Sequence, residues 1–204
     1  MAITNGYCTL AEARAQIGIT EATDTTDDSM IEAKVEAISR AIDSATGTRF
    51  YRNGTDETRY YTGNDSLVFE CPDDIGSVTT LTTDEDGDRT YERTWAATDY
   101  DLTPFNAVLD GKPYTALEVT PDGDYAFPTV RKGIQVLGKF GYSASTPAAI
   151  KAACLLAMQK LFKRKDAPFG VEGTGEQGIM QMMKTDPDLV MLLSGFTRNV
   201  GVAV

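Results

Sequence analysis

Apolar residues near the start of the chain recur at helical spacing. The first apolar face consists of Leu10, Ala13 and Ile17. Thr9 and Glu12 form a capping-box pattern before it, because each side chain can bond a free backbone N–H of the first turn. A glycine at the other end, Gly18, is typical of a helix terminus. The pattern predicts a short amphipathic helix.

A longer segment with the same spacing follows a polar loop at 20–28. Asp27 or Asp28 is placed to cap its start, and Gly47 is placed to end it. Its apolar positions are Ile31, Val35, Ile38, Ile42 and Ala45. They lie on one stripe, which predicts a second amphipathic helix packed against a neighbour.

The pattern changes in the middle of the chain, where Thr, Tyr, Val, Asp and Gly dominate. Short runs of strand-forming residues alternate there with turn signals. The predicted strands cover 58–62, 66–70, 77–83, 89–95, 116–119 and 134–140. Asp86-Gly87 lies between two of them and indicates a hairpin. We therefore expect an antiparallel unit of about five or six strands.

Helical spacing returns after Thr146-Pro147, a pair that fits the cap and first turn of a helix. The apolar stripe of this long third helix contains Ile150, Cys154, Ala157, Met158, Leu161 and Phe162. Four glycines within 170–178 predict a flexible linker. Asp186-Pro187 then begins a last, short helix.

This order of elements predicts an α+β fold. We expect a small helical bundle of two N-terminal helices, one long C-terminal helix and one short C-terminal helix, with an inserted antiparallel β unit. The helical part would consist of 1–52 and 131–204, and the insert of 53–130. An insertion of this kind is tolerated because the two ends of an inserted unit usually lie close together.

Composition excludes several classes of protein. Apolar residues make up 42% of the 204 residues, enough for a buried core. The chain has no histidine, which excludes Ser-His and Cys-His catalysis and histidine metal sites. Its three cysteines fit neither a zinc site nor a disulfide framework, and Cys154 is interpreted as a core thiol. No leader and no membrane-spanning run is evident, so we expect synthesis in the cytoplasm and no membrane partner.

Charge is distributed unevenly along the chain. The formal net charge is −11, the opposite sign from that of a generic nucleic-acid binder. Residues 1–130 contain 25 acids and 9 bases, whereas 131–204 contain 5 acids and 10 bases. Two interpretations explain this asymmetry equally well. Acidic surface loops could keep the first part soluble, or oppositely charged faces of neighbouring copies could meet in a head-to-tail assembly.

Three patterns resemble ligand or catalytic sites. The acidic run at 84–88 fits neither register of an EF-hand loop and is interpreted as a solvated hairpin turn. The G-x-G-x-x-G string at 173–178 lacks a preceding strand and is interpreted as linker. Asp99, Asp101 and Glu118 could pair on adjacent strands, but surface carboxylates are the simpler interpretation. We therefore predict no catalytic residue, no metal site and no cofactor, and no enzyme activity.

Four stretches together resemble a known family. They are YCTLAEARAQIGI at 7–19, AISRAIDSATGTRFYR at 37–52, GKFGYSASTPAAIKAACLLAMQKLFKRKD at 138–166 and DPDLVMLLSGFTR at 186–198. Their order and spacing are similar to those of the head-to-tail connector, or adaptor, proteins of long-tailed double-stranded DNA bacteriophages. The middle of the chain resembles the β insertion of longer relatives.

The resemblance implies a structural function at the head–tail junction of a virion. Such proteins form a ring, expected to contain about twelve copies, beneath the portal of the filled capsid. The ring extends the DNA channel and offers a surface to the stopper or tail. The partners implied are other copies of the chain, the portal protein, a stopper or tail protein, and DNA that passes without specific binding. The family has no catalytic residues and no cofactor.

Two groups of residues are candidates for assembly contacts. The closing segment is apolar for so short a helix, so it must pack on something. It supplies the portal-docking candidates Asp188, Leu189, Leu192, Leu193, Phe196 and Arg198, with packing on its own second helix as the alternative. The candidates for the subunit interface are Asp27, Asp28, Glu32, Glu36, Lys160, Lys163, Arg164 and Lys165. For the basic ones, complementing a helix dipole is an equal alternative.

Other functions fit parts of the sequence. A stopper or tail-completion protein one layer lower would share the assembly features. A β-type ligand-binding module for carbohydrate or calcium would explain the acidic turn at 84–88.

Overall fold

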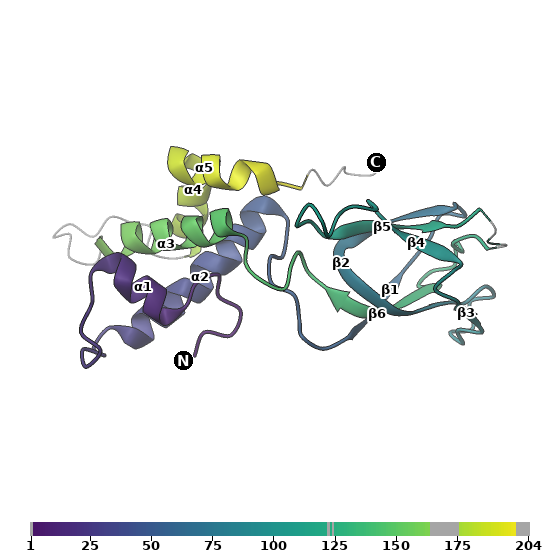
Figure 1. Cartoon of the computed structure of the whole chain (residues 1–204), viewed down its shortest axis with the longest axis horizontal. Helices are drawn as coiled ribbons and strands as arrows, with labels where there is room; N and C mark the ends of the chain where they lie inside the picture. The colour runs from purple at the N-terminus through teal and green to yellow at the C-terminus, as the bar shows by residue number, and fades with distance from the viewer. Residues whose placement is uncertain (1, 122, 124, 164–175, 199–204) are drawn as a thin grey trace. The chain divides into compact units, whose positions relative to one another are not determined.

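The computed structural model describes residues 2–121, 123, 125–163 and 176–198. They form two compact units. Residues 1–50 and 146–204 make up a helical unit, and residues 51–145 make up an antiparallel β unit (Figure 1). The mixture of helices and antiparallel sheet agrees with the predicted α+β class.

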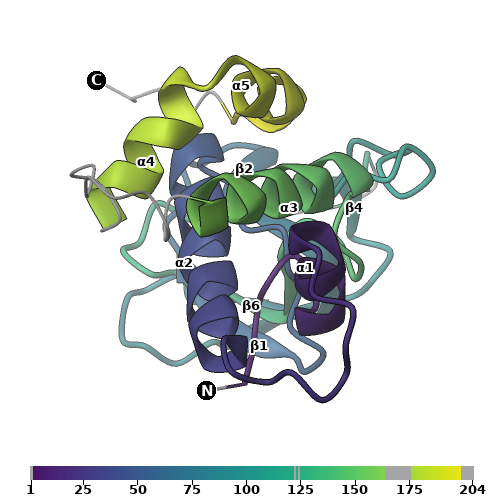
Figure 2. The same cartoon turned by 90° about the vertical axis from the view of Figure 1, so that its left-hand side faces the viewer.

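The helical unit is built from α1 (Leu10–Ile17), α2 (Asp28–Thr46), α3 (Ala148–Lys163), α4 (Glu176–Thr185) and α5 (Pro187–Leu193), with a 3₁₀ turn at Ser194–Phe196. Within it, α1 and α2 both pack on α3, α4 packs on α2, and α5 packs on α3 and α4 (Figure 2). The two halves of the unit therefore interlock, although nearly a hundred residues of sequence separate them.

Local signals set several helix ends as predicted. The Thr9 hydroxyl accepts from Glu12 N–H at 3.2 Å, and Glu12 accepts from Thr9 N–H at 2.8 Å, so the capping box of α1 is complete. Gly18 and Gly47 adopt positive φ at the ends of α1 and α2. Asp27 occupies the N-cap position of α2 but makes no side-chain capping bond there.

The prediction of a linker throughout 170–178 was wrong at its C-terminal end. Residues 164–175 lie outside the described residues, but α4 begins at Glu176 and includes Gly178. Ile179, Met182 and Met183 are buried, and α4 packs on α2. This burial outweighs the low helix propensity of the glycine, and it makes Met182 and Met183 core residues.

Two thiols lie in the core of the helical unit. The Sγ atoms of Cys8 and Cys154 are 3.6 Å apart, and both residues are buried. The hydrogen bond with Cys8 and burial raise the pKa of the Cys154 thiol well above its usual range. Cys154 is therefore a neutral core thiol, as its place in the apolar stripe predicted.

The β unit contains β1 (Glu57–Tyr61), β2 (Val68–Thr83), β3 (Arg93–Trp95), β4 (Tyr100–Thr103), β5 (Tyr114–Val119) and β6 (Ile134–Phe140). All strand pairs are antiparallel, in the order β1-β6-β2-β5-β4, and β3 pairs with the end of β2. The strands enclose an aromatic core in which the Trp95 and Phe127 rings stack with centroids 5.0 Å apart. β1 and β4 are thus the outer strands of the sheet.

The long strand β2 joins two segments that the sequence suggested were separate strands. Pro72, Asp73 and Gly76 are turn-type residues, yet the strand continues through them. It does so with register shifts between Glu70 and Ile75 and again before Ser77. Such irregularities bend a strand, so β2 pairs with β5 along its first half and with β6 along its second half.

The predicted boundary of the insert at residue 130 was too early. β6 lies beyond that boundary, but it pairs with both β1 and β2 and contributes Ile134, Val136 and Phe140 to the β core. Hydrogen bonding and burial assign it to the β unit, which ends at Ser145. Tyr51 and Ser143 form a bridge, so the chain enters and leaves this unit side by side.

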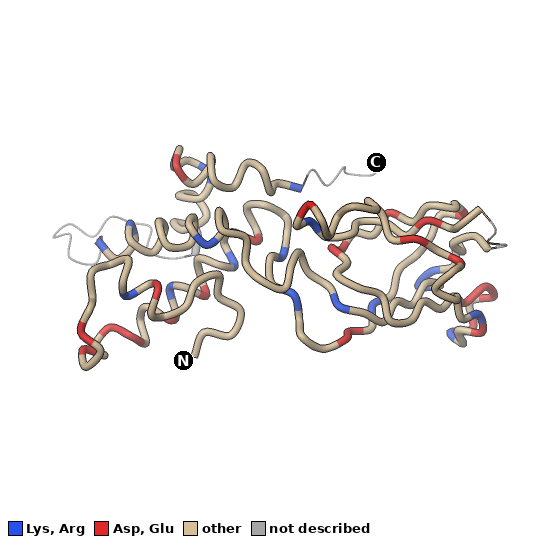
Figure 3. Tube along the Cα trace, in the orientation of Figure 1, with Lys and Arg blue, Asp and Glu red and all other residues tan. Residues whose placement is uncertain are grey.

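The acidic surplus belongs mainly to the β unit. Residues 51–145 contain 17 acids and 8 bases, whereas the helical unit contains 13 acids and 11 bases. Figure 3 shows acidic positions spread over the strands and loops of the β unit. The charge asymmetry of the sequence therefore follows the folded units rather than the two ends of the chain.

Candidate assembly surfaces

The acidic turn after β2 is held by its own hydrogen bonds. The buried carboxylate of Asp84 accepts from the N–H groups of Gly87 and Arg89, at 2.7 and 3.0 Å. Burial alone would raise the pKa of Asp84, but these bonds outweigh it and hold the pKa below the usual range. This is the hairpin turn that Asp86-Gly87 indicated, with β2 and β3 paired on either side.

The same turn brings four carboxylates together. One oxygen from each of Asp84, Asp86, Asp88 and Glu92 can be chosen so that all lie within 4.8 Å of one another. Carboxylate oxygens suit a hard cation such as Ca²⁺. Asp86 and Asp88 also accept bonds from backbone N–H groups of the same turn, and three of the four carboxylates are exposed.

The three carboxylates considered for catalysis occupy the surface of β4 and β5 and the turn before β4. Asp101 and Glu118 lie opposite each other on these two strands, as the sequence suggested. Asp99 instead accepts from Ala96 N–H at 2.8 Å and orders the turn before β4. Asp101 is exposed and Glu118 is partly exposed.

The closing segment packs on its own unit. Leu189 and Leu193 are buried between α5 and its neighbours, and the Phe196 ring meets Phe50 edge-on with centroids 5.5 Å apart. Arg198 N–H donates to the Thr46 carbonyl at 2.9 Å. Leu192 is half-buried. The apolar residues that marked this segment therefore stabilise the helical unit, chiefly on α3 and α4 rather than on the second helix.

The outer side of α5 remains open to solvent. Val190 and Met191 are exposed by 42% and 71%. Asp186 caps the helix by accepting from the N–H groups of Asp188 and Leu189, and Lys160 donates to Asp186 at 2.6 Å. The Lys160 ammonium holds the pKa of Asp186 below its usual range. The cap and the ion pair fix the direction in which Val190 and Met191 point.

Most candidates for charged subunit contacts already have partners within the helical unit. Asp28 accepts two bonds from Arg14, both 2.9 Å long, and Glu36 accepts from Asn5 N–H at 2.9 Å. Lys160 pairs with Asp186 and, at 3.3 Å, with Asp188. Asp27 and Glu32 also make interactions within the chain. Lys163 is exposed at the end of α3, and Arg164 and Lys165 lie outside the described residues.

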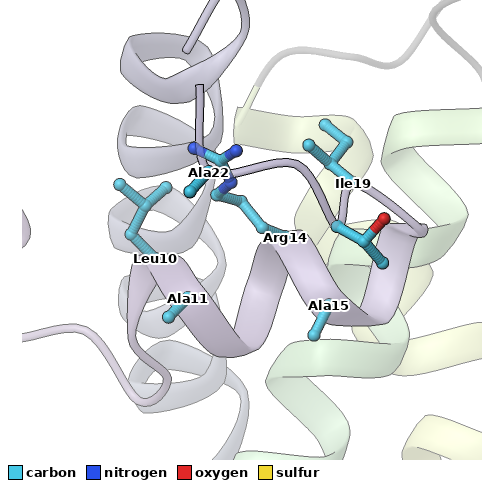
Figure 4. A pocket seen from close by; sticks show the side chains of 7 residues that line it. Leu10, Ala11, Arg14, Ala15, Ile19 and Ala22 are labelled. Atoms are coloured by element: carbon cyan, nitrogen blue, oxygen red, sulfur yellow. The ribbon is translucent and has the colours of Figure 1, made fainter. Parts of the chain in front are cut away.

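A pocket of about 600 Å³ lies against the outer side of α1 (Figure 4). It is lined by Leu10, Ala11, Arg14, Ala15, Ile19, Thr20 and Ala22. The Arg14–Asp28 ion pair joins the wall of this pocket to α2. Small apolar residues dominate the lining, so the pocket suits an apolar side chain of a partner better than a polar ligand.

One exposed apolar region was missed in the sequence. Phe105, Val108 and Leu109, in the loop between β4 and β5, are exposed by 66%, 64% and 86%. The available signal was the presence of three large apolar residues between Pro104 and Gly111, where a turn is normally polar. Exposed apolar residues gathered in this way mark interaction surfaces.

No family model matches the sequence, and no curated protein matches it. The fold, however, is similar to that of solved chains. A chain in the neck of an empty gene transfer agent (GTA) particle, computed with C6 symmetry, superimposes with a TM-score of 0.55 at 18% identity, covering 89% of this chain and 91% of the other. A chain in the virion of the native GTA particle superimposes with a TM-score of 0.53 at 16% sequence identity. The match covers 89% of this chain and 91% of the other. A chain in the native GTA neck, computed with C12 symmetry, superimposes with a TM-score of 0.53 at 16% sequence identity. The match covers 89% of this chain and 90% of the other.

These similarities extend over both units and establish a shared fold. Among the helices in the described part of the chain, none has the length and apolar character needed to cross a bilayer.

Proposed function

We propose that this chain is a structural protein of a virion neck, at the junction of head and tail. The observation that carries the proposal is the fold similarity to GTA neck chains over 89% of this chain. The sequence resemblance to phage connector proteins was reached from separate features, namely the order and spacing of four stretches of sequence. Both point to assembly rather than catalysis.

In this role the chain forms a ring of about twelve copies that joins the portal to the stopper or tail. The neck structures with the same fold are described with six-fold and twelve-fold symmetry, which favours this copy number. A ring closes through a heterologous interface, in which two different faces of each copy meet.

DNA would pass through such a ring without specific binding. The 17 acids and 8 bases of the β unit disfavour tight contact with phosphates. We expect the purified protein to leave double-stranded DNA unbound at 0.15 M salt in a filter-binding assay. Tight binding at that salt would contradict a conduit of this kind.

Native mass tests the proposal directly. We expect the purified chain alone to have either the mass of one 22.1 kDa copy or that of a ring. Mixed with its cognate portal, it should join in a fixed ratio. A monomer that ignores the portal at physiological salt would contradict the adaptor function. Binding to a tail protein instead would favour a stopper or tail-completion protein one layer lower.

Portal docking through the closing segment is part of the proposal. Since Leu189 and Leu193 are buried in the helical unit, the exposed apolar residues Val190 and Met191, beside the exposed candidate Asp188, are available for docking. A truncation after Thr185 would also damage the fold, so a surface substitution is the sharper test. Met191→Glu should weaken portal binding, whereas Gln181→Glu, at an exposed position of α4, should not. Equal binding by both variants would exclude this surface.

A calcium titration separates the remaining alternative, a β-type ligand-binding module. If the grouped carboxylates at 84–92 bind Ca²⁺ in solution, the melting temperature should rise with added Ca²⁺. A structural neck protein requires no such shift.

A further inference from the structure

The outer strands of the β unit carry two chemically different faces. We propose that these faces meet between neighbouring copies, so that the β units form a continuous belt around the ring. The inference rests on the proposed ring and assigns a role to the β unit within it.

The first face lies at β4 and β5. It combines exposed apolar side chains with carboxylates, and we call it the apolar–acidic face: Leu67, Asp101, Phe105, Val108, Leu109 and Glu118. Leu67, Asp101, Phe105 and Glu118 line one pocket of about 510 Å³. This pocket gives the face a hollow into which a partner's side chain can fit.

The loop that carries Phe105 and Leu109 is ordered by its own bonds. Ala107 N–H donates to the Pro104 carbonyl at 3.0 Å, and Lys112 N–H donates to the Ala107 carbonyl at 2.8 Å. Ala107 itself is buried and anchors the loop. The apolar side chains are thus presented by a fixed backbone, which lowers the entropy cost of binding.

The second face lies at β1, the other outer strand, and at the loops beside it, next to the acidic turn at 84–92, where Asp84 N–H donates to the Gly133 carbonyl at 2.8 Å. We call it the aromatic–basic face: Tyr60, Tyr91, Arg131 and Lys132. Tyr60 is 47% exposed, its ring centroid lies 5.9 Å from that of Tyr91, and Lys132 Nζ lies 5.9 Å from the Tyr60 centroid. The Tyr91 hydroxyl donates to the Lys132 carbonyl at 2.8 Å, so the group is held together.

The charged residues named on the two faces have opposite signs, and Lys132 makes a cation–π contact with the Tyr60 ring rather than an ion pair. In the described part of the molecule, Asp101 and Glu118 form no ion pair, and neither do Arg131 and Lys132. Apolar side chains next to carboxylates match aromatic rings next to cations in both hydrophobic and electrostatic terms. A second copy of this chain therefore supplies the matching surface.

The strand order makes the contact heterologous. β1 and β4 are the two ends of the order β1-β6-β2-β5-β4, so the two faces lie on separate strands and share no residue. Two different faces that match each other generate a closed ring or an open helix, not a dimer.

Charge reversal tests this arrangement in the full chain. The variant Asp101→Lys/Glu118→Lys makes both faces basic, and Arg131→Glu/Lys132→Glu makes both acidic. We expect each variant alone to lose the ring population by roughly tenfold or more at 0.15 M salt, because like charges then meet at every interface. If the wild type forms rings only on its portal, the same comparison is made with portal present.

Mixing the two variants should restore the ring. An alternating ring places a basic face against an acidic face at every contact, and an even copy number such as twelve permits it. The quadruple variant, which carries all four reversals, is the matched control. It has the net charge of the wild type and carries the substitutions of both double variants. Because its two faces again have opposite charges, it should form a ring without a second variant.

The outcomes separate the inference from the proposed function. If the double variants form rings as well as the wild type does, the belt is wrong and the ring proposal stands. A second outcome also contradicts the belt: the double variants fold but form no ring, and neither their mixture nor the quadruple variant restores ring formation. The two faces then do not meet. If the wild type neither forms a ring nor joins the portal, both proposals fail.

Discussion

Neighbouring residues of α5 face opposite environments. Leu189 is fully buried against the helical unit, whereas Met191, two residues later, is 71% exposed. The first side chain contributes to folding through its burial, and the second is available to a partner. The two functions proposed for the closing segment can therefore be tested separately.

Alanine substitutions at these two positions should differ in their effect on stability. Leu189→Ala removes a buried side chain and leaves a cavity, so the free energy of unfolding should fall by about 2–4 kcal/mol. Met191→Ala should change it by less than about 0.5 kcal/mol. Urea unfolding followed by circular dichroism measures both. A small loss for Leu189→Ala would mean that the segment is not packed as the structure shows.

The sequence identified which residues of the closing segment are apolar but not what they contact. Leu189, Leu193 and Phe196 stood out because a short helix is unstable alone. Whether such residues pack inward or outward depends on α3, α4 and Phe50, which the local pattern does not reveal. For the same reason the sequence marks Phe105 and Leu109 as apolar residues in a turn region but does not show how far they are exposed, since that depends on what the rest of the fold leaves uncovered.

At the scale of elements, local signals succeed where the interaction is local. The capping box of α1 involves only Thr9 and Glu12, and both of its bonds are present. The prediction failed where distant partners decide. β2 continues through Pro72 and Gly76 because β5 and β6 pair with it, and α4 forms because α2 covers its apolar side.

The capping box makes a measurable contribution to α1. Thr9→Ala removes the acceptor for Glu12 N–H and should lower the free energy of unfolding by about 1 kcal/mol. Thr9→Ser keeps a hydroxyl at the same position and is the matched control, with little expected change. Equal losses in the two variants would show that the methyl group, not the hydrogen bond, matters.

The start of α5 should become less stable in acid. The pKa of Asp186 in the folded chain is lowered by Lys160, below an unfolded value of about 3.9. Its contribution is therefore complete above that value and is lost as the pH falls through the lower folded pKa. Unfolding midpoints in urea at pH 7 and pH 3 should differ less in Asp186→Asn, which keeps a capping oxygen but loses the charge.

Another carboxyl group also contributes to this acid sensitivity. Lys151 and the capping bond lower the pKa of Glu12, so α1 loses a stabilising interaction over a similar range. Glu12→Gln measures the contribution of Glu12 separately.

If Asp186→Asn retains the full pH dependence of the wild type, the ion pair with Lys160 does not stabilise α5.

At the scale of the whole molecule, the order of helices, β unit and helices was predictable because the periodicity changes along the chain. The C-terminal boundary of the insert was not predictable from the sequence, because β6 is apolar and lies next to the third helix in sequence. Its assignment depends on pairing with β1 and β2. The charge asymmetry was visible in the sequence, but only the two units show that it is mainly a property of the β unit.

Separating the two units tests the organisation of the chain and the division of roles within it. Tyr51 and Ser143 are bridged, so a short Gly/Ser linker between Phe50 and Thr146 can replace the β unit without strain. The joined helical unit should fold and bind the portal through α5, and residues 51–145 alone should fold as a β unit. Without the β unit, the belt contacts are absent and ring formation on the portal should weaken. Circular dichroism and native mass report these outcomes. A joined helical unit that folds but ignores the portal would assign docking to the β unit instead.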